Sequence, residues 1–335
     1  MQAECRRRLS IRDTVFEAVH LVTPTHTNPL GTLHGGVMLR WIITTATMAS
    51  MRATRGYTVL AHLDNVFFIN PVRQGESVTL TAWIDYAGTT SLDLTVYVES
   101  EDPSTGDRRL TTASHMTMVH VNSELKPEPH GLCITPADDY EDELYREALI
   151  RRRERPSRGE RAAAARDVTP PRPLIDDVSM TTAKLVNPED TIAYNVMHAG
   201  RLMYLMDELA GMTAMRYSKR VVVTAAVDAT DFYSPIWVGD ILEINAALTY
   251  VGRTSMEITL KAIAETPLTG ERRHAATSHF TMVALGDDGR PVEVPKPRKP
   301  AGREELAKAE ARRRLRMKRL AFVKERITAF KPPKP

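Results

Sequence analysis

The feature that most constrains this sequence is an internal repeat with one constant offset. His34 stands in a His-Gly-Gly motif, and His198 stands in His-Ala-Gly 164 positions later. Further matching pairs at the same offset are Pro24 with Pro188, Asp64 with Asp228, Phe68 with Phe232, Gly88 with Gly252, and His115 with His279. The register holds without a gap from about residue 20 to about residue 119. Because this period is far longer than a solenoid repeat, the chain is predicted to hold two whole domains of one kind.

Each copy predicts a buried helix followed by antiparallel strands. The helical stretches, 37–51 and 202–215, are apolar almost all round, as is typical of a helix that lies inside a domain. In the first copy, strand-like segments rich in Val, Ile, Thr and Tyr follow at 57–70, 76–87, 91–101 and 108–121. Their hairpin-length connections exclude a parallel doubly wound sheet. The fold class is therefore α+β, with a sheet that curls around the helix in each copy.

Two charged segments flank the second copy. We place the boundaries of the first domain at 1–124, of a linker at 125–167, of the second domain at 168–290 and of a tail at 291–335. Residues 142–151 have helical character, which Pro156–Gly159 is predicted to end. Residues 301–335 hold 12 Lys and Arg against 4 Asp and Glu. The linker helix is predicted to lie on the surface and the basic tail to form a solvated helix.

Composition excludes several classes of protein. Apolar residues make up 42% and charged residues 26%, as in a folded globular chain. No apolar run approaches the roughly 18–20 residues of a membrane helix, and no secretory leader is apparent. A net charge of +3 makes no case for nucleic-acid binding. Cys5 and Cys133 show no metal or redox spacing, so we expect a cytoplasmic protein with no metal and no cofactor.

Several segments in combination resemble the hotdog-fold acyl-CoA thioesterases. They are Asn28-Pro-Leu-Gly31-Thr-Leu-His34-Gly35-Gly36, Asp207 placed seven residues after Gly200, and the stretches 227–235 and 251–257. Two copies in one chain resemble the tandem-hotdog acyl-CoA hydrolases, over residues 15–124 and 177–290. The resemblance implies two hotdog domains, each an antiparallel sheet wrapped around a long central helix, paired as a pseudo-dimer. It also implies hydrolysis of acyl-CoA to free fatty acid and coenzyme A.

The resemblance further implies a site between the copies, in which an acid on one central helix faces the helix start of the other copy. A helix start presents unpaired N–H groups, and Gly35 and Gly36 allow a thioester carbonyl to approach them closely. Asp207 would take a proton from water or attack the carbonyl itself. Asn28 would donate to the carbonyl or position the water, or it serves only as a turn residue. His34 is as well explained by a structural hydrogen bond as by catalysis.

The two copies have lost complementary residues. Ile43 stands at the position that matches Asp207, and Ile192 stands at the position that matches Asn28. One site therefore combines Asn28 and residues 34–36 with Asp207, and we name it the first site. The other combines Ile192 and residues 198–200 with Ile43, and we name it the second site. Glu208 is an alternative acid, but its spacing from Gly200 favours Asp207. One functional site per chain is expected.

Coenzyme A contacts and assembly come from the resemblance alone. The residues it points to are Thr224, Ala225, Ala226, Arg253, Thr254 and Ser255, with Thr89, Thr90 and Ser91 opposite. It also implies a homo-oligomer, with a trimer of double-hotdog chains favoured. Three other functions stay open: a hydratase or dehydratase of acyl thioesters, a non-catalytic protein that binds or senses acyl-CoA, and an interaction module that uses the basic tail. We assign no chemical role to His115, His279, Asp64 or Asp228.

Overall fold

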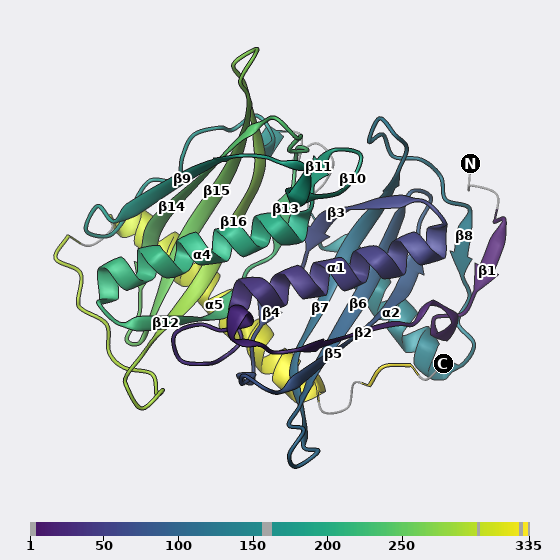
Figure 1. The fold of residues 1–335 in the computed structure, drawn as a ribbon, viewed down its shortest axis with the longest axis horizontal. Coiled ribbons are helices and arrows are strands. Elements are labelled where there is room, and N and C mark those ends of the chain that lie inside the picture. Colours follow the sequence, from purple (N-terminus) through teal and green to yellow (C-terminus); the bar gives the residue numbers. More distant parts are fainter. Residues whose placement is uncertain (1–4, 156–162, 300–301, 328–330, 334–335) are drawn as a thin grey trace.

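Two copies of one α+β unit lie side by side in the computed structural model, which describes residues 5–155, 163–299, 302–327 and 331–333 (Figure 1). The first unit comprises β2 (Phe16–Leu21), α1 (Gly35–Thr54), β3 (Tyr57–Leu63), β4 (Val66–Phe67), β5 (Ser77–Ala87), β6 (Ser91–Glu101) and β7 (Arg108–Val121). The second comprises β9 (Ser179–Leu185), α4 (Ala199–Ser218), β12 (Val221–Val227), β13 (Thr230–Phe232), β14 (Ile241–Val251), β15 (Ser255–Thr266) and β16 (Glu271–Leu285). This is the α+β class that the repeat predicts.

Further strands, helices and short 3₁₀ helices complete the described part of the chain. The strands are β1 (Arg7–Leu9) with β8 (Leu132–Ile134) and β10 (Thr191–Ala193) with β11 (Val196–Met197), and the helices are α2 (Asp139–Arg153) and α5 (Arg303–Ile327). The 3₁₀ helices are η1 (Arg12–Thr14), η2 (Pro24–His26) and η3 (Pro188–Asp190).

One continuous 12-stranded sheet joins the two units. Its order is β2-β5-β6-β7-β3-β13-β16-β15-β14-β9, and β4 and β12 pair beside the junction. At the junction β3 and β13 are antiparallel, with His62 opposite Asp231. The imidazole of His62 lies 3.0 Å from a carboxylate oxygen of Asp231 and 3.0 Å from one of Asp64. Burial alone would lower the pKa of His62, but these two carboxylates raise it, so a charged network fastens the junction.

The central helices α1 and α4 lie against each other on the same side of the sheet (Figure 1). Both exceed the predicted stretches by about one turn, because His34 and His198 serve as N-caps. Both end at a residue in the left-handed region, Arg55 at φ 59° and Lys219 at φ 55°. Most side chains of both helices are buried, as their apolar sequences predict.

The strands of the first unit follow the predicted segments closely, with two differences. The segment predicted at 57–70 is broken after Leu63, where the chain leaves β3 and forms the short strand β4 against the other unit. The edge strands β2 and β9 have no counterpart among the predicted segments. The linker helix is α2, and its predicted end at Pro156–Gly159 lies outside the described residues.

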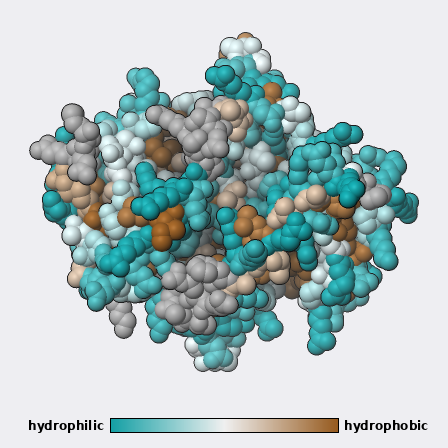
Figure 2. All heavy atoms as spheres, turned by 180° about the vertical axis from the view of Figure 1, so that it is seen from behind, coloured by the Kyte–Doolittle hydropathy of each residue, from teal (hydrophilic) through white to brown (hydrophobic). Residues whose placement is uncertain are grey.

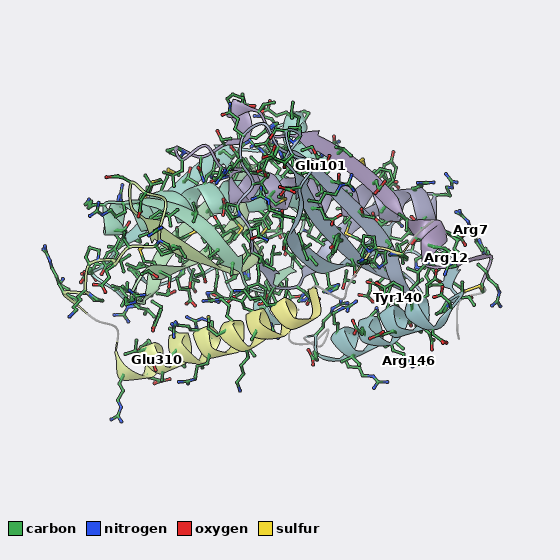
Figure 3. All side chains as sticks on the ribbon, turned by 90° about the horizontal axis from the view of Figure 1, so that it is seen from below. Arg7, Arg12, Glu101, Tyr140, Arg146 and Glu310 are labelled. Carbon is green, nitrogen blue, oxygen red and sulfur yellow. A yellow bond between two sulfur atoms is a disulfide. The ribbon has the colours of Figure 1, made fainter. Side chains whose placement is uncertain are left out.

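The prediction of a solvated tail helix is wrong. Helix α5 packs against the outer side of the second unit, and α2 lies beside it on the outer side of the first unit (Figure 3). Seen from behind the view of Figure 1, the surface is mostly hydrophilic with separate hydrophobic spots (Figure 2). The basic sequence of α5 concealed the docking, because two of its arginines are turned inward.

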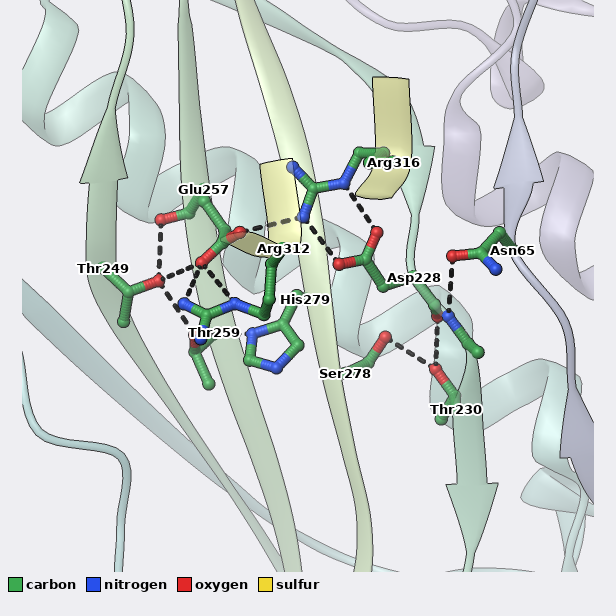
Figure 4. Close-up of polar contacts among 11 residues, drawn as sticks. Asn65, Asp228, Thr230, Thr249, Glu257, Thr259, Ser278, His279, Arg312 and Arg316 are labelled. Carbon is green, nitrogen blue, oxygen red and sulfur yellow. Dashed lines mark hydrogen bonds and ion pairs between the residues drawn. The ribbon is translucent and has the colours of Figure 1, made fainter. Parts of the chain in front are cut away.

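Arg312 and Arg316 bind a pair of carboxylates on the sheet (Figure 4). Arg316 makes a bidentate contact with Asp228, at 2.6 Å for each nitrogen, and reaches Glu257 at 2.8 Å. Arg312 reaches Glu257 at 2.5 Å. Burial would raise the pKa of Glu257, but the hydrogen bonds and charges around it, led by Arg312, lower it to about 2. Asp228 thus holds the tail helix in place.

The linker helix docks in the same way. Arg152 binds Asp93 at 3.0 Å, and Arg151 lies 3.2 Å from Asp85. Asp93 and Glu257 are related by the offset of 164. Each unit therefore carries a buried acidic position on its outer face that is neutralised by arginines from the helix that follows the unit.

Cys5 and Cys133 are joined as a disulfide, although their sequence spacing suggests no pairing. The reason is the parallel pairing of β1 with β8, which sets Arg8 opposite Cys133. The absence of a redox spacing in the sequence was therefore a poor guide to these two residues. No described helix has the length and apolar character needed to cross a membrane. Within the described ranges no group of His, Cys, Asp and Glu side chains is arranged to hold a metal.

Candidate active site

The first site lies where the start of α1 meets the middle of α4. The Gly36 N–H donates to Oδ2 of Asp207 at 2.6 Å, and the hydroxyl of Thr224 donates to Oδ1 at 2.6 Å. Nδ1 of His34 lies 3.3 Å from the same carboxylate. Asp207 belongs to the second unit and Gly36 to the first, so this hydrogen bond joins the two units. A carboxylate at a helix N-terminus is favoured by the helix dipole.

Glycine is required at this helix start because the units touch there. A Cβ atom added to Gly35 would lie 2.7 Å from Oγ1 and 2.8 Å from Cβ of Thr224. One added to Gly36 would lie 3.0 Å from the carbonyl oxygen of Tyr204 and 3.1 Å from Cβ of Asp207. The two glycines therefore let α1 approach α4 and β12 closely enough for the hydrogen bonds to form.

The environment of Asp207 perturbs its ionisation. Its side chain is 1% exposed. Burial raises the pKa of Asp207 above its ordinary value, although the charge of His34 and the hydrogen bonds from Thr224 and Gly36 act in the opposite direction. A buried carboxyl with a perturbed pKa beside a helix start is typical of a catalytic site. The adjacent Glu208 is only partly buried and accepts a hydrogen bond from the Tyr204 hydroxyl at 2.8 Å.

Asn28 closes its own loop. Its Oδ1 accepts from the N–H of Leu30 at 2.9 Å and of Thr32 at 3.3 Å, and its Nδ2 donates to the Thr32 hydroxyl at 2.8 Å. Among the described residues no hydrogen bond joins Asn28 to Asp207. The loop leads into His34, whose N–H donates to the His26 carbonyl at 2.9 Å. Asn28 therefore shapes the segment that enters the first site.

The second site has the same backbone and different side chains. His198 occupies the N-cap position of α4 without a capping hydrogen bond from its side chain, and its Nε2 lies 3.2 Å from the Thr47 hydroxyl of α1. Burial lowers the pKa of His198 to about 4, and Arg40 adds to this effect. Ile43 is fully buried where the first site has its acid, and Ile192 is 46% exposed. A cavity of about 370 Å³ lies at this second site, and neither Asp207 nor Thr224 lines it.

The residues predicted to contact coenzyme A lie in three segments. Thr224, Ala225 and Ala226 lie on β12, where Thr224 reaches Asp207 and the Ala225 carbonyl accepts from Phe68 of the other unit at 3.0 Å. Arg253, Thr254 and Ser255 form the turn from β14 to β15, and Arg253 is exposed.

The residues predicted opposite them, Thr89, Thr90 and Ser91, form the turn from β5 to β6 in the first unit. Ser91 pairs with Val119, which lines the cavity, and its hydroxyl accepts from Arg152 at 3.0 Å. No described contact joins this turn to Asp207.

The hydrogen bond from Thr224 to Asp207 was not predicted from the sequence. The signal was available, because the constant offset sets Leu60 against Thr224. Threonine is kept in the copy that keeps the acid, and leucine stands in the copy that lost it. Three polar positions of the first site thus have apolar counterparts in the second: Asp207 with Ile43, Asn28 with Ile192 and Thr224 with Leu60.

Comparison with known proteins agrees with the duplicated architecture. The family model of the thioesterase superfamily matches twice, at residues 30–106 and 194–271. The cytosolic acyl coenzyme A thioester hydrolase of Mus musculus is 30% identical over 289 residues, which cover 82% of this chain and 75% of that protein. An uncharacterized acyl-CoA thioester hydrolase of Bacillus subtilis is 39% identical over 128 residues, covering 38% of this chain and 74% of that protein.

Among solved structures, an acyl-ACP thioesterase from Bacteroides thetaiotaomicron superimposes with a TM-score of 0.52. The match covers 82% of this chain and all of that one at 15% identity, so it bears on the fold alone. The two matches to the family model coincide with the two units of the sheet, and the murine relative spans both units. The chain is therefore a member of the thioesterase superfamily, with two hotdog domains paired in one polypeptide.

Proposed function

We propose that this protein hydrolyses acyl-CoA thioesters to free fatty acid and coenzyme A, with one functional site per chain. The observation that carries the proposal is the buried carboxylate of Asp207, held by Gly36 of the other unit and by Thr224. The similarity to relatives described as acyl-CoA thioester hydrolases supports the same reaction.

Asp207 acts as a general base in this proposal. It takes a proton from a water molecule while the water oxygen attacks the thioester carbonyl. The carbon–sulfur bond then breaks as Asp207 returns this proton to the sulfur, so coenzyme A leaves as its thiol and Asp207 is again a carboxylate. Both carboxylate oxygens are fixed by donors, which suits proton transfer at a defined position. Direct attack by the carboxylate would require one oxygen to leave its donor. Single-turnover hydrolysis in heavy-oxygen water tests this step, because the base route places the label in the released fatty acid.

The carbonyl is polarised at the start of α1. The N–H of Gly36 is directed to Asp207, whereas the N–H of Gly35 makes no hydrogen bond within the described part of the chain. Gly35 is thus the available donor beside the acid, at the positive end of the helix dipole. One such donor is worth about 3 kcal/mol to an oxyanion in a desolvated site.

Release of free thiol from acyl-CoA substrates of several chain lengths tests the activity directly. We expect Asn28→Ala and Asn28→Asp both to lower turnover. Asn28→Asp keeps the acceptor for the Leu30 and Thr32 N–H groups, but it removes the amide donor and adds a negative charge near the carbonyl that the amide would contact. Asn122→Ala is the matched control, because Asn122 closes another turn in the same way and lies outside the site. A wild-type chain that releases no thiol from any acyl-CoA would refute the proposed function.

Three further features belong to this proposal. Thr224, Ala225 and Ala226, with the turn at 253–255 and the turn at 89–91 opposite, bind the pantetheine arm and nucleotide of the substrate. The chain assembles as a homo-oligomer, with a trimer of double-hotdog chains favoured, and acts in the cytoplasm. No metal or cofactor takes part, because the base, the donor and the water suffice for the reaction.

A further inference from the structure

The cavity at the second site is bounded by both units. Thr47 and Met51 of α1 and residues 59–61 of β3 form one side, and the segments 192–199 and 232–237 of the second unit form the other. Its volume of about 370 Å³ lies within the usual range of small-molecule sites. The space is therefore large enough to hold a ligand, although the second site lacks the acid.

The substitutions that remove the chemistry also make this site more apolar. Leu60, which is 7% exposed, lines the cavity where the first site has Thr224. Ile192 lies at the rim, 46% exposed, where the first site has Asn28. The duplicated scaffold has thus kept the space between the units while it replaced polar side chains with aliphatic ones.

The charges of the lining define what can enter. No lysine or arginine lines the cavity, so the described residues offer no partner for a phosphate or a carboxylate inside it. Its one carboxylate, Glu124, forms an exposed ion pair with Lys126 at 2.7 Å. His198 is neutral near pH 7, since its pKa is about 4. The part of a ligand inside must therefore be uncharged and apolar, because an unpaired charge is costly to desolvate.

The rim suits a ligand with an amphipathic head. The rings of Tyr57 and Tyr194 meet edge to face at 4.4 Å, and Tyr57 is 40% exposed. Tyr194 and Asn195 both have positive φ, at 53° and 56°, so this turn is held in an uncommon conformation beside the opening. Aromatic side chains with a polar tip are well suited to the boundary between an apolar chain and water.

We propose that the second site binds the aliphatic chain of a fatty acyl group without cleaving it and leaves the polar head at the rim. The choice of an acyl chain rests on the proposed function, whose substrate and product both carry one. The chain thus has one site that hydrolyses acyl-CoA and one that binds an acyl chain without cleaving it, both built on the same scaffold.

Equilibrium titration of the full chain carrying Asp207→Asn with hexadecyl-CoA thioether, which has no carbonyl to hydrolyse, tests the proposal. We expect two bound equivalents per chain. Ala61→Phe, which fills the cavity, and Ile192→Arg, which sets a charge at the rim, should each reduce this number to one. Ala225→Phe is the matched control, because Ala225 corresponds to Ala61 at the offset of 164 and should remove the other equivalent. Two variants of different character guard against a folding defect in either one.

Chain length and head group give the remaining tests. The equivalent that Ala61→Phe removes should tighten about fourfold for each added methylene until the cavity is filled. Displacement of the thioether by hexadecanoate would assign this site to the fatty acid product, and resistance to hexadecanoate would assign it to the thioester. One equivalent in the starting chain, two equivalents surviving both substitutions, or no dependence on chain length would each overturn the inference. Failure of the proposed function would appear separately, as a wild-type chain that releases no thiol.

Discussion

Replacing Asp207 by asparagine separates the charge of the acid from its shape. Asparagine retains an acceptor for the Gly36 N–H and a group that can share a hydrogen bond with the Thr224 hydroxyl, both now at 2.6 Å. What disappears is the ability to take a proton. A positioned general base contributes about 10²–10⁴-fold to a rate. We therefore expect Asp207→Asn to lower kcat by this factor, equivalent to about 3–5 kcal/mol in the barrier.

The assay is thiol release from an acyl-CoA under saturating conditions, with circular dichroism to establish that the variant is folded. Glu208→Gln is the matched control, because Glu208 is adjacent in α4 and its carboxylate accepts from the Tyr204 hydroxyl instead of from the donors that hold Asp207. It should keep turnover within a few fold of the wild type. A folded Asp207→Asn variant with more than about one tenth of wild-type turnover would refute the reasoning, since a base that matters contributes at least about a hundredfold.

As the pH rises, the stability of the folded wild type and its turnover should change in opposite directions. Because burial raises the pKa of Asp207 in the folded state, the folded protein binds its proton more tightly than the unfolded chain does. The wild type therefore loses stability as the pH rises from about 4 through the raised pKa, and the loss is complete above it. The asparagine side chain does not ionise, so the variant does not lose stability in this way. The melting temperature of Asp207→Asn relative to the wild type should thus increase with pH over this window, whereas turnover of the wild type should rise over the same window as the base ionises.

Three more outcomes can be measured on the same chain. Gly35→Ala should lower turnover, and overpacking should lower the free energy of unfolding by about 1–3 kcal/mol. In Gly211→Ala the added Cβ meets nothing closer than 3.8 Å. This control should raise the free energy of unfolding, measured with denaturant, by about 0.5–1 kcal/mol. Arg316→Ala should destabilise the protein by about 3–5 kcal/mol, because Asp228 loses its bidentate partner and the buried Glu257 loses one of its two arginines. Arg314→Ala, on the exposed side of α5, should destabilise it by less than about 1 kcal/mol. Equal urea midpoints for the two variants would contradict this. Because the pKa of Glu257 is depressed from 4.5 to about 2, its ion pairs should stabilise the fold above pH 4.5, and about 3 kcal/mol should be lost as the pH falls to about 2 in an acid titration of unfolding free energy.

The repeat alone predicts the paired helices and most strands, because burial periodicity and turn residues are local signals. The resemblance to the hotdog thioesterases points to Asp207 and Asn28, and the repeat adds that neither has a counterpart at the constant offset, so together they predict which unit supplies each side chain of the first site. The edge strands β2 and β9 were not predicted because neither has a fully buried side chain that would mark a core face, and apolar residues such as Val19 and Leu185 are exposed.

Docking of the charged helices escaped prediction for a different reason. A basic helix suggests solvent exposure, and only the tertiary structure brings Arg316 to Asp228 at 2.6 Å. The role of Thr224 beside the acid likewise depends on where β12 meets α4. The disulfide between Cys5 and Cys133 depends on a pairing of strands far apart in the sequence.

The single sheet that runs through both units has a consequence for how the molecule can change over generations. In a dimer of identical chains every mutation appears in both clefts, so neither can lose its acid without the other losing it as well. Fusion after duplication removes this coupling, and Ile43 can coexist with Asp207. Dilution cannot separate the halves either, because their encounter is intramolecular. The halves can therefore diverge while they remain assembled at any protein concentration.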